Sequence, residues 1–379
     1  MARAPALQEI EALPEADRLE GFPHPREAAQ LFGHQEAERT LAEALGSGRI
    51  HHGWLLAGPE GIGKATLAYR FAAYALAGPE ERGDPNDGLA LSRHAMAPRM
   101  VRVLSHPGLL LIRRPYDTKT KRFAASIPVD EVRKLRNFLA HTVGSRSAAP
   151  SAIQRVVIVD QADELNSSSA NALLKSLEEP PPQTLFLLIT SQPGRLLPTI
   201  RSRCRTLVLP ALGTEDLRAA ATQALAAAEM NPPGADDWQP LLHLAQGSVR
   251  RLLGLATSDG LKLAQRLYAI VERLPEVDWS AAHALSDEIG SAAAEQKFEA
   301  FFNLLLDMVA RLIRAAATGE GEPRELALAQ RLIGTDRLSA WAEMWETIVS
   351  RKNETQALNL DRKALILDVL ARMQQAARR

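Results

Sequence analysis

The chain has 379 residues, of which 46% are hydrophobic and 24% are charged. It is long enough for two or three domains and apolar enough to bury a core, which excludes a mainly disordered chain. Lysine plus arginine and aspartate plus glutamate each number 45, so the formal net charge is zero. The whole chain therefore has no field that attracts nucleic acid or a membrane, and any DNA contact must be local or shared with partners.

The N-terminal segment and the cysteine count bear on the compartment. Residues 1–27 are rich in Pro and Glu, lack the apolar core of a signal peptide and are expected to form a poorly ordered arm. Cys204 is the only cysteine, which excludes an internal disulfide and a cysteine-rich metal site. The most apolar stretch, 298–313, is interrupted by Asp307 and Arg311, which predicts a buried helix and no membrane span. We therefore expect a cytoplasmic protein that makes no membrane contact.

Short apolar runs alternate with helical segments in the first half of the chain. The runs are GWLLAG, LLLIRR, RVVIVD, LFLLIT and TLVLP. Because they are continuous, both faces of the sheet that they form must be covered, which predicts a parallel α/β layer. After Pro210 such runs stop, and the remainder of the sequence is expected to be helical.

The segment GPEGIGKAT, residues 58–66, lies between an apolar run and a helical segment. A strand, a glycine loop and a helix in this order are typical of a phosphate-binding loop, whose backbone N–H groups surround phosphate oxygens. Gly58, Gly61 and Gly63 permit the necessary curve, and Lys64 would reach the β and γ phosphates. A simple glycine turn before a helix is the alternative.

Two positions of this site lack groups that ATP hydrolysis requires. Ala65 occupies the place of the Ser or Thr whose hydroxyl coordinates magnesium, and Thr66 is about 100° further round the helix. Asp160 ends an apolar strand and is the candidate magnesium-side acid, but Gln161 follows it where hydrolysing ring ATPases carry a water-activating glutamate. Loss of a general base costs about 10²- to 10⁴-fold in rate, so we expect slow or absent turnover.

Polar residues near the same sheet edge have two interpretations each. Thr190 and Ser191 follow the next apolar strand, where their hydroxyls would either contact the γ phosphate or cap the strand end. Asp163 and Glu164 lie beyond Asp160 and are expected to be solvated capping acids rather than catalytic groups.

The motifs together resemble a known family. GPEGIGKAT, VVIVDQADELNSSSANALLKSLEEPPPQTLFLLITS and the Ser202-Arg203-Cys204 triplet resemble, in order and spacing, the clamp-loader subunits of the AAA+ superfamily, and among them the delta prime family of bacterial DNA polymerase III. The resemblance covers most of residues 28–255, and LNLDRKALILDVLARM resembles the last helix of that family. It implies an arm at 1–27, a P-loop (AAA+) α/β domain with a parallel sheet at 28–211, a small helical lid at 212–260 and an all-α collar at 261–379 that joins a ring.

The resemblance also implies roles for two arginines. Arg203 would be an arginine finger acting in trans on the ATP of a neighbouring motor subunit, and Arg250 would reach from the lid to the nucleotide. Without the triplet, Arg203 would be interpreted as a solvated arginine in a cluster with its neighbours. A finger accelerates hydrolysis by about 10³- to 10⁵-fold, so a chain without turnover of its own can still control ATP hydrolysis. Cys204 is expected to be a small buried residue.

The implied partners are the other clamp-loader subunits, namely the motor ATPase subunits and delta, the sliding clamp, and primer-template DNA reached through the assembled complex. Lys175, Arg133 and Lys134 are candidates for DNA contact, with solvated surface side chains as the alternative. ATP or ADP would bind weakly or without hydrolysis. Many relatives hold zinc with four cysteines after the P-loop helix, but this chain has only the isolated His94 and His106 in that stretch, so we expect no zinc and no other metal site.

We therefore expect a non-hydrolysing, stator-like subunit of a clamp loader. Two other functions stay open. A self-contained AAA+ ATPase acting on DNA would need the acid and the hydroxyl that are missing at Gln161 and Ala65. A scaffold with an empty nucleotide pocket is disfavoured by the retained glycines and Lys64.

Overall fold

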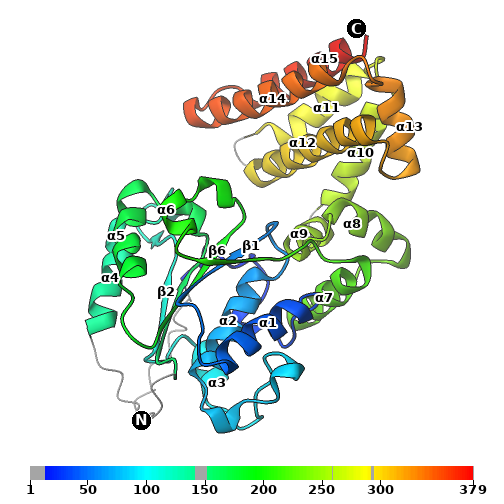
Figure 1. The fold of residues 1–379 in the computed structure, drawn as a ribbon. Helices are drawn as coiled ribbons and strands as arrows, with labels where there is room; N and C mark the ends of the chain where they lie inside the picture. Colours follow the sequence, from blue (N-terminus) through cyan, green and yellow to red (C-terminus); the bar gives the residue numbers. More distant parts are fainter. Residues whose placement is uncertain (1–12, 141–151, 258, 292–293, 379) are drawn as a thin grey trace, which may run out of the picture. The chain divides into compact units, whose positions relative to one another are not determined.

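A computed structural model describes residues 13–140, 152–257, 259–291 and 294–378 (Figure 1). The chain forms two compact units, Met1–Leu253 and Gly254–Arg379. Among the described residues, no helix is both long and apolar enough to span a bilayer.

A parallel sheet of five strands forms the centre of the first unit. In spatial order the strands are β2 (Leu109–Ile112), β5 (Arg155–Val159), β6 (Thr184–Thr190), β1 (Gly53–Ala57) and β7 (Arg205–Val208). Every residue of β1 and β6 is buried. This confirms the parallel α/β layer that the continuous apolar runs predict, since such strands need cover on both faces.

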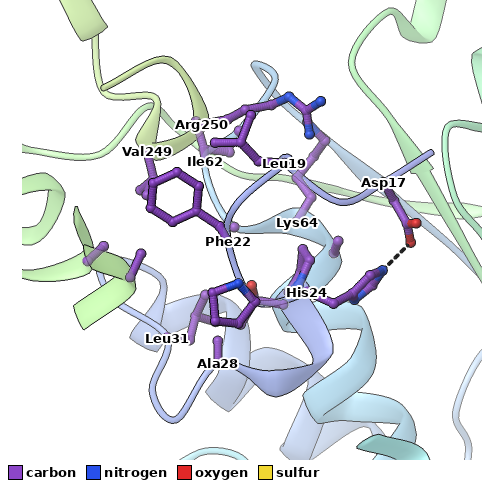
Figure 2. A pocket seen from close by; sticks show the side chains of 18 of the residues that line it. Asp17, Leu19, Phe22, His24, Ala28, Leu31, Ile62, Lys64, Val249 and Arg250 are labelled. Carbon is purple, nitrogen blue, oxygen red and sulfur yellow. Dashed lines mark ion pairs between the residues drawn. The ribbon is translucent and has the colours of Figure 1, made fainter. Parts of the chain in front are cut away.

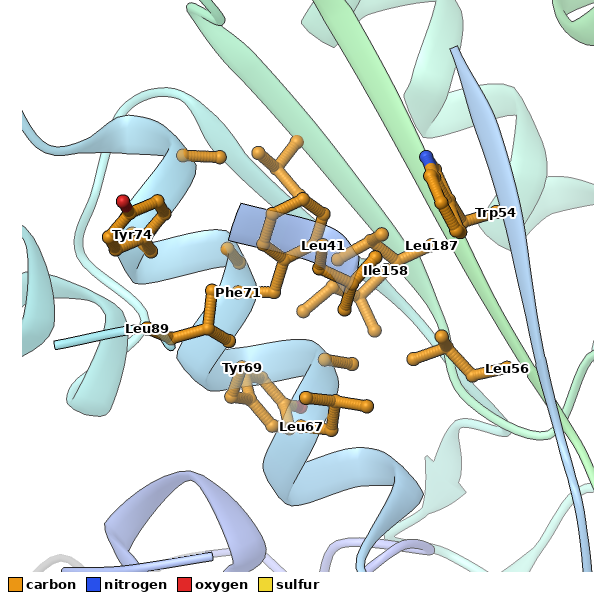
Figure 3. Packing of buried hydrophobic residues seen from close by; sticks show 14 of the residues in the cluster. Leu41, Trp54, Leu56, Leu67, Tyr69, Phe71, Tyr74, Leu89, Ile158 and Leu187 are labelled. Atoms are coloured by element: carbon orange, nitrogen blue, oxygen red, sulfur yellow. The ribbon is translucent and has the colours of Figure 1, made fainter. Parts of the chain in front are cut away.

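Helices cover the two faces of the sheet, and alternate strand residues contact them. One face packs Trp54, Leu56, Ile158 and Leu187 against α1, α2 and α3 (Figure 3). The other face packs residues such as Phe186 against α4, α5 and α6. The bounds of these helices are α1 (Gln35–Gly46), α2 (Lys64–Leu76), α3 (Ala97–Arg102), α4 (Val129–Ala140), α5 (Ser167–Glu178) and α6 (Pro198–Arg201).

Smaller elements and a helical segment complete the first unit. After the sheet come α7 (Thr214–Ala227), α8 (Trp238–Ala245) and the start of α9 (Val249–Thr257). The strands β3 (Tyr116–Asp117) and β4 (Arg122–Phe123) pair antiparallel as a small hairpin. The short 3-10 helices are η1 (Pro25–Glu27), η2 (Pro79–Glu81), η3 (Pro85–Asp87), η4 (Ala162–Glu164), η5 (Pro193–Arg195) and η6 (Ala235–Asp237).

The described part of the N-terminal arm is packed against the first unit. Phe22 and His24 are 3% and 1% exposed, and Asp17 is 9% exposed. The expectation of a poorly ordered arm therefore does not hold for residues 13–27, because ion pairs and an aromatic side chain fix this segment. Residues 1–12 lie outside the described residues.

The second unit is helical throughout its described residues. Its helices are α10 (Gly260–Glu272), α11 (Trp279–Ile289), α12 (Glu295–Thr318), α13 (Pro323–Leu332), α14 (Leu338–Leu358) and α15 (Arg362–Arg378). Phe298, Phe301 and Phe302 of α12 are fully buried, which confirms the buried helix predicted for this stretch.

A buried polar network surrounds Arg311, the arginine that interrupts the apolar sequence of α12. Arg311 donates from Nε to Glu325 Oε1 over 2.8 Å, and the Tyr268 hydroxyl donates to the same oxygen over 2.7 Å. Arg311 Nη2 also donates to the Tyr268 hydroxyl over 2.8 Å. Burial raises the pKa of Tyr268 to about 12, so its proton stays in place. The charge of Arg311 is thus compensated inside the unit.

Replacing Glu325 is expected to destabilise the second unit strongly. Glu325→Ala leaves the Arg311 cation buried without its carboxylate, and breaking such a pair costs about 3–5 kcal/mol of unfolding free energy. Urea denaturation of the full chain measures this loss. The matched control is Asp287→Ala, which removes an exposed ion pair with Lys363 and is expected to change nothing measurable. Equal effects of the two substitutions would contradict the assignment.

Candidate phosphate-binding site

The loop between β1 and α2 has the shape of a phosphate cradle. Gly58, Gly61 and Gly63 have φ of 154°, 75° and 106°, a region that side chains disfavour. A Cβ on Gly58 would lie 2.3 Å from the Leu209 carbonyl oxygen, and one on Gly61 would lie 2.5 Å from the Cβ of Arg250. The glycines are thus required both by the turn and by the close approach of neighbouring backbone. The strand, loop and helix follow in the predicted order.

The loop is tied to the first turn of α9. The backbone N–H of Val249 donates to the Gly61 carbonyl over 2.9 Å, and that of Arg250 donates to the same oxygen over 3.4 Å. The guanidinium of Arg250 lies 3.4 Å from the Glu60 carboxylate. The predicted lid arginine therefore lies at the phosphate loop, next to an acid of the loop itself.

Lys64 begins α2 and is 5% exposed. Its ammonium donates to the carbonyls of Gly58 and Pro59 over 2.8 and 2.5 Å and to the Ser191 hydroxyl over 3.0 Å. Burial lowers the pKa of Lys64 to about 8, although nearby carboxylates favour its charge. The lysine is held at the loop where a phosphate would need a cation.

Asp160, the acid predicted for the magnesium side, lines the same cavity as Asp17 of the arm. It follows β5 and is 4% exposed. Burial and the neighbouring Asp17 raise the pKa of Asp160 well above its ordinary value. Burial also opposes the charge of Asp17, but the hydrogen bond from His24 and the charges of His24 and Arg113 outweigh it and hold the pKa of Asp17 well below its usual range.

Two arginines and a histidine contact the acids of the arm. Arg113 Nη1 donates to Asp17 over 2.5 Å, and its Nη2 donates to Glu15 over 2.6 Å. Arg26 binds Glu15 with two hydrogen bonds of 2.9 and 3.0 Å. His24 Nε2 lies 2.8 Å from Asp17, and a dashed line marks this contact in Figure 2. None of these residues belongs to a sequence motif, and the Pro- and Glu-rich composition of the arm predicts a poorly ordered segment instead.

A cavity of about 270 Å³ lies between the arm, the phosphate loop and the helices after the sheet. Phe22 from the arm points toward Val249 at one side of it, with Ile62 behind (Figure 2). Lys64 and Asp160 line it from the sheet edge, together with Thr66, which is half-buried. The cavity therefore combines an apolar part with the residues predicted for the phosphates.

The other polar residues at this edge are bound to the protein. Thr190 is fully buried and accepts the Gln192 N–H over 3.1 Å, which is the strand-capping alternative. Asp163 accepts the Ser191 N–H over 3.2 Å, and Glu164 pairs with Arg114 over 2.5 Å. These two acids are half-buried and paired, so the expectation of solvated acids was wrong.

Gln161 lies directly at the tip of β5 and lines the cavity. Its φ of 63° and ψ of 62° place its backbone in the left-handed region, which is uncommon for residues other than glycine. Because an amide does not accept a proton from water at neutral pH, this position cannot supply a general base.

The residues of the cavity fit a phosphate group better than a magnesium ion. The three glycines form a cradle that a Cβ would fill, and Lys64 supplies the charge. Asp160 Oδ2 is buried without a hydrogen-bond partner among the described residues, burial and the neighbouring Asp17 raise the pKa of this carboxyl and so disfavour its charge, and Ala65 has no side-chain oxygen. The described residues also include no group of three or more His, Cys, Asp or Glu side chains that could hold a metal.

Arg203 lies away from this cavity, on the surface of the first unit. Its side chain is 35% exposed; Nη2 pairs with Glu178 over 2.9 Å, and Nη1 donates to the Thr199 carbonyl over 2.9 Å. Cys204 beside it is half-buried and packs against the core next to Gly53, where a fully buried residue was expected, and burial raises the pKa of its thiol to about 11.

The candidates for DNA contact lie on α4 and α5. Arg133 pairs with Asp130 and Lys134 with Glu131, each over 2.7 Å within the same helix. Lys175 is exposed on α5. The charges of Arg133 and Lys134 are thus partly neutralised by their own helix.

Known proteins resemble this chain in sequence and in structure. A model of the family described as DNA polymerase III, delta subunit, matches residues 33–213. The chain is 36% identical over 215 residues to DNA polymerase III subunit delta' of Pseudomonas aeruginosa. The aligned region covers 56% of this chain and 58% of that protein. It is 28% identical over 336 residues to subunit delta' of Escherichia coli. This aligned region covers 88% of this chain and 92% of that protein.

Among solved structures, a DNA polymerase III gamma-subunit-related protein of Thermotoga maritima aligns with 91% of this chain and all of its own chain, at 16% identity and a TM-score of 0.41. The match to the Pseudomonas relative spans little more than half of that relative, whereas the match to the E. coli relative spans nearly all of it.

The buried ammonium of Lys64 is expected to make stability depend on pH. Because its folded pKa of about 8 lies below the ordinary 10.5, the unfolded chain holds a proton between these values that the folded chain has released. The unfolding free energy therefore rises with pH across this window, by about 2 kcal/mol between pH 7 and pH 10 relative to Lys64→Met. Thermal or urea unfolding of both proteins at the two pH values measures it. A constant difference would contradict the shifted pKa.

Proposed function

Since the chain belongs to the delta prime family of DNA polymerase III subunits, we propose that it is a clamp-loader subunit that does not hydrolyse ATP itself and that supplies Arg203 to the ATP site of a neighbouring motor subunit. Its proposed partners are the motor subunits, delta and the sliding clamp, and primer-template DNA through the assembled complex. The proposed location is the cytoplasm. ATP or ADP is the proposed ligand of its own pocket, without zinc.

The observation that carries the non-hydrolysing role is Gln161 at the tip of β5. Three of the carboxylates that line the cavity are bound to the protein: Asp17 contacts Arg113 and His24, Glu60 pairs with Arg250, and Glu27 accepts the His24 N–H. The fourth, Asp160, is the candidate magnesium-side acid, and the position after it, where the water-activating glutamate would stand, is Gln161. With Ala65 in place of a magnesium ligand, the pocket retains the groups for binding phosphate and lacks those for cleaving it.

The surface position of Arg203 supports a role on another subunit. Its ion pair with Glu178 is partly exposed, and such pairs contribute about 0–1 kcal/mol, so little free energy opposes its release. A finger that accelerates hydrolysis by about 10³- to 10⁵-fold lowers the barrier by roughly 4–7 kcal/mol. The interaction with a developing phosphate charge therefore outweighs the resting pair.

Replacing Arg203 tests the finger directly. In the reconstituted loader, Arg203→Ala is expected to reduce the DNA-stimulated ATPase of the whole ring at least about tenfold, because the neighbouring site loses its cation. Assembly, followed by size-exclusion chromatography, should be unchanged. The matched control is Arg201→Ala, an exposed arginine two residues earlier, which should retain full ATPase.

A second substitution separates the finger from general surface charge. Glu178→Gln removes the resting partner of Arg203 and leaves the finger itself intact. The ATPase of the ring should then equal or exceed that of the unmodified complex. Unchanged activity with Arg203→Ala, or loss of assembly as the sole effect, would overturn the proposal.

The isolated chain distinguishes the two other functions. We expect a steady-state turnover below about 0.01 per second, since typical rates near one per second are reduced by the missing base. Turnover near one per second would instead indicate a self-contained ATPase. Calorimetry is expected to detect nucleotide binding, and its absence up to millimolar ADP or ATP would favour a scaffold with an empty pocket.

A further inference from the structure

We propose that Glu60 is a specificity-determining residue of the nucleotide pocket. Its carboxylate binds the guanidinium of Arg250 in the place of a phosphate and repels a phosphate that enters the loop, so the pocket binds ADP more tightly than ATP. The inference deepens the proposed function and rests on it only in that a nucleotide enters this pocket. It does not depend on Arg203.

The backbone on both sides of Glu60 is bound to the rest of the site. The carbonyl of Pro59 accepts a hydrogen bond from Lys64 Nζ over 2.5 Å, and the carbonyl of Gly61 accepts the Val249 N–H over 2.9 Å. Glu60 lines the cavity together with Lys64 and with Arg250. The loop therefore holds a negative side chain at the cavity whose cations are predicted to bind phosphate.

The close approach of α9 to the loop places Arg250 beside this carboxylate. A Cβ on Gly61 would lie 2.5 Å from the Cβ of Arg250, and the Arg250 N–H donates to the Gly61 carbonyl over 3.4 Å. Arg250 Nε lies 3.4 Å from Glu60 Oε1, and the two side chains are 38% and 59% exposed. A phosphate that arrives from solvent can thus reach the same guanidinium that Glu60 occupies.

The competition between carboxylate and phosphate has a direction that depends on charge. A guanidinium binds both groups through the same N–H donors, so Glu60 and a phosphate compete for Arg250. An exposed ion pair is weak, which means that Glu60 lowers the affinity for a nucleotide without excluding it. Repulsion grows with the charge of the phosphate chain. Because ATP carries one phosphate group more than ADP, Glu60 disfavours ATP more strongly.

Calorimetry on the purified full chain tests this, in EDTA so that no metal neutralises the nucleotide. The unmodified protein should bind ADP at least about threefold more tightly than ATP. Glu60→Gln keeps the size of the side chain and should bind ADP about threefold and ATP about tenfold more tightly than the unmodified protein, because a repulsive charge is lost and Arg250 is released. The matched control Glu346→Gln removes an exposed carboxylate of α14 and should change neither affinity.

Two further titrations separate an electrostatic role of Glu60 from a structural one. Between about 0.1 and about 1 M salt the Debye length falls from about 10 to about 3 Å, so the gain in ATP affinity with Glu60→Gln should fall below about threefold. The same gain should also fall below about threefold when Arg250→Ala is present in both proteins, because the competition is for this guanidinium. A gain of threefold or more in either titration would overturn the inference.

The unmodified protein decides the question without any variant as well. Binding of ATP as tightly as ADP would overturn the inference while leaving the proposed nucleotide pocket in place, and so would equal gains for the two nucleotides with Glu60→Gln. Failure of both nucleotides to bind would overturn it too, but would leave the Arg203 assay unaffected. An ATPase that does not respond to Arg203→Ala likewise leaves the calorimetric result intact.

Discussion

The parallel pairing of β1, β5 and β6 is the constraint on which the first unit depends. Because all three strands run in the same direction, the phosphate loop, Asp160 and Thr190 meet at one edge. Each strand must be buried on both faces to hold this register, and the two core clusters do so. The chemistry of the edge is therefore set by a few residues after each strand, while the strands themselves are interchangeable apolar segments.

Much of this could be predicted from sequence, because it rests on local patterns. The apolar runs specify buried parallel strands, and the glycines with Lys64 specify the phosphate loop. The arm could not be predicted, since Asp17 is fixed by Arg113, a residue 96 positions away, and composition alone makes an acidic, proline-rich segment look disordered. The half-buried position of Asp163 could not be predicted for the same reason. Its hydrogen-bond partner is the backbone N–H of Ser191, which only the folded sheet brings close.

Lys64 illustrates how function sets a local cost in stability. A buried ammonium with a lowered pKa is less favourable than an apolar side chain of similar length, and the loop carbonyls compensate it only in part. Under the proposed function, the same burial would strengthen the attraction of Lys64 for a phosphate. Arg203 differs, since it is partly solvated and weakly paired, so its charge is available to a surface other than its own.

The carbonyl of Gly61 accepts hydrogen bonds from the first turn of α9, and Gly61 itself lines the cavity. The loop and the first turn of α9 are therefore held together at this carbonyl. A larger residue at Gly61 would alter both at once, because its Cβ would collide with the hydroxyl of Ser248.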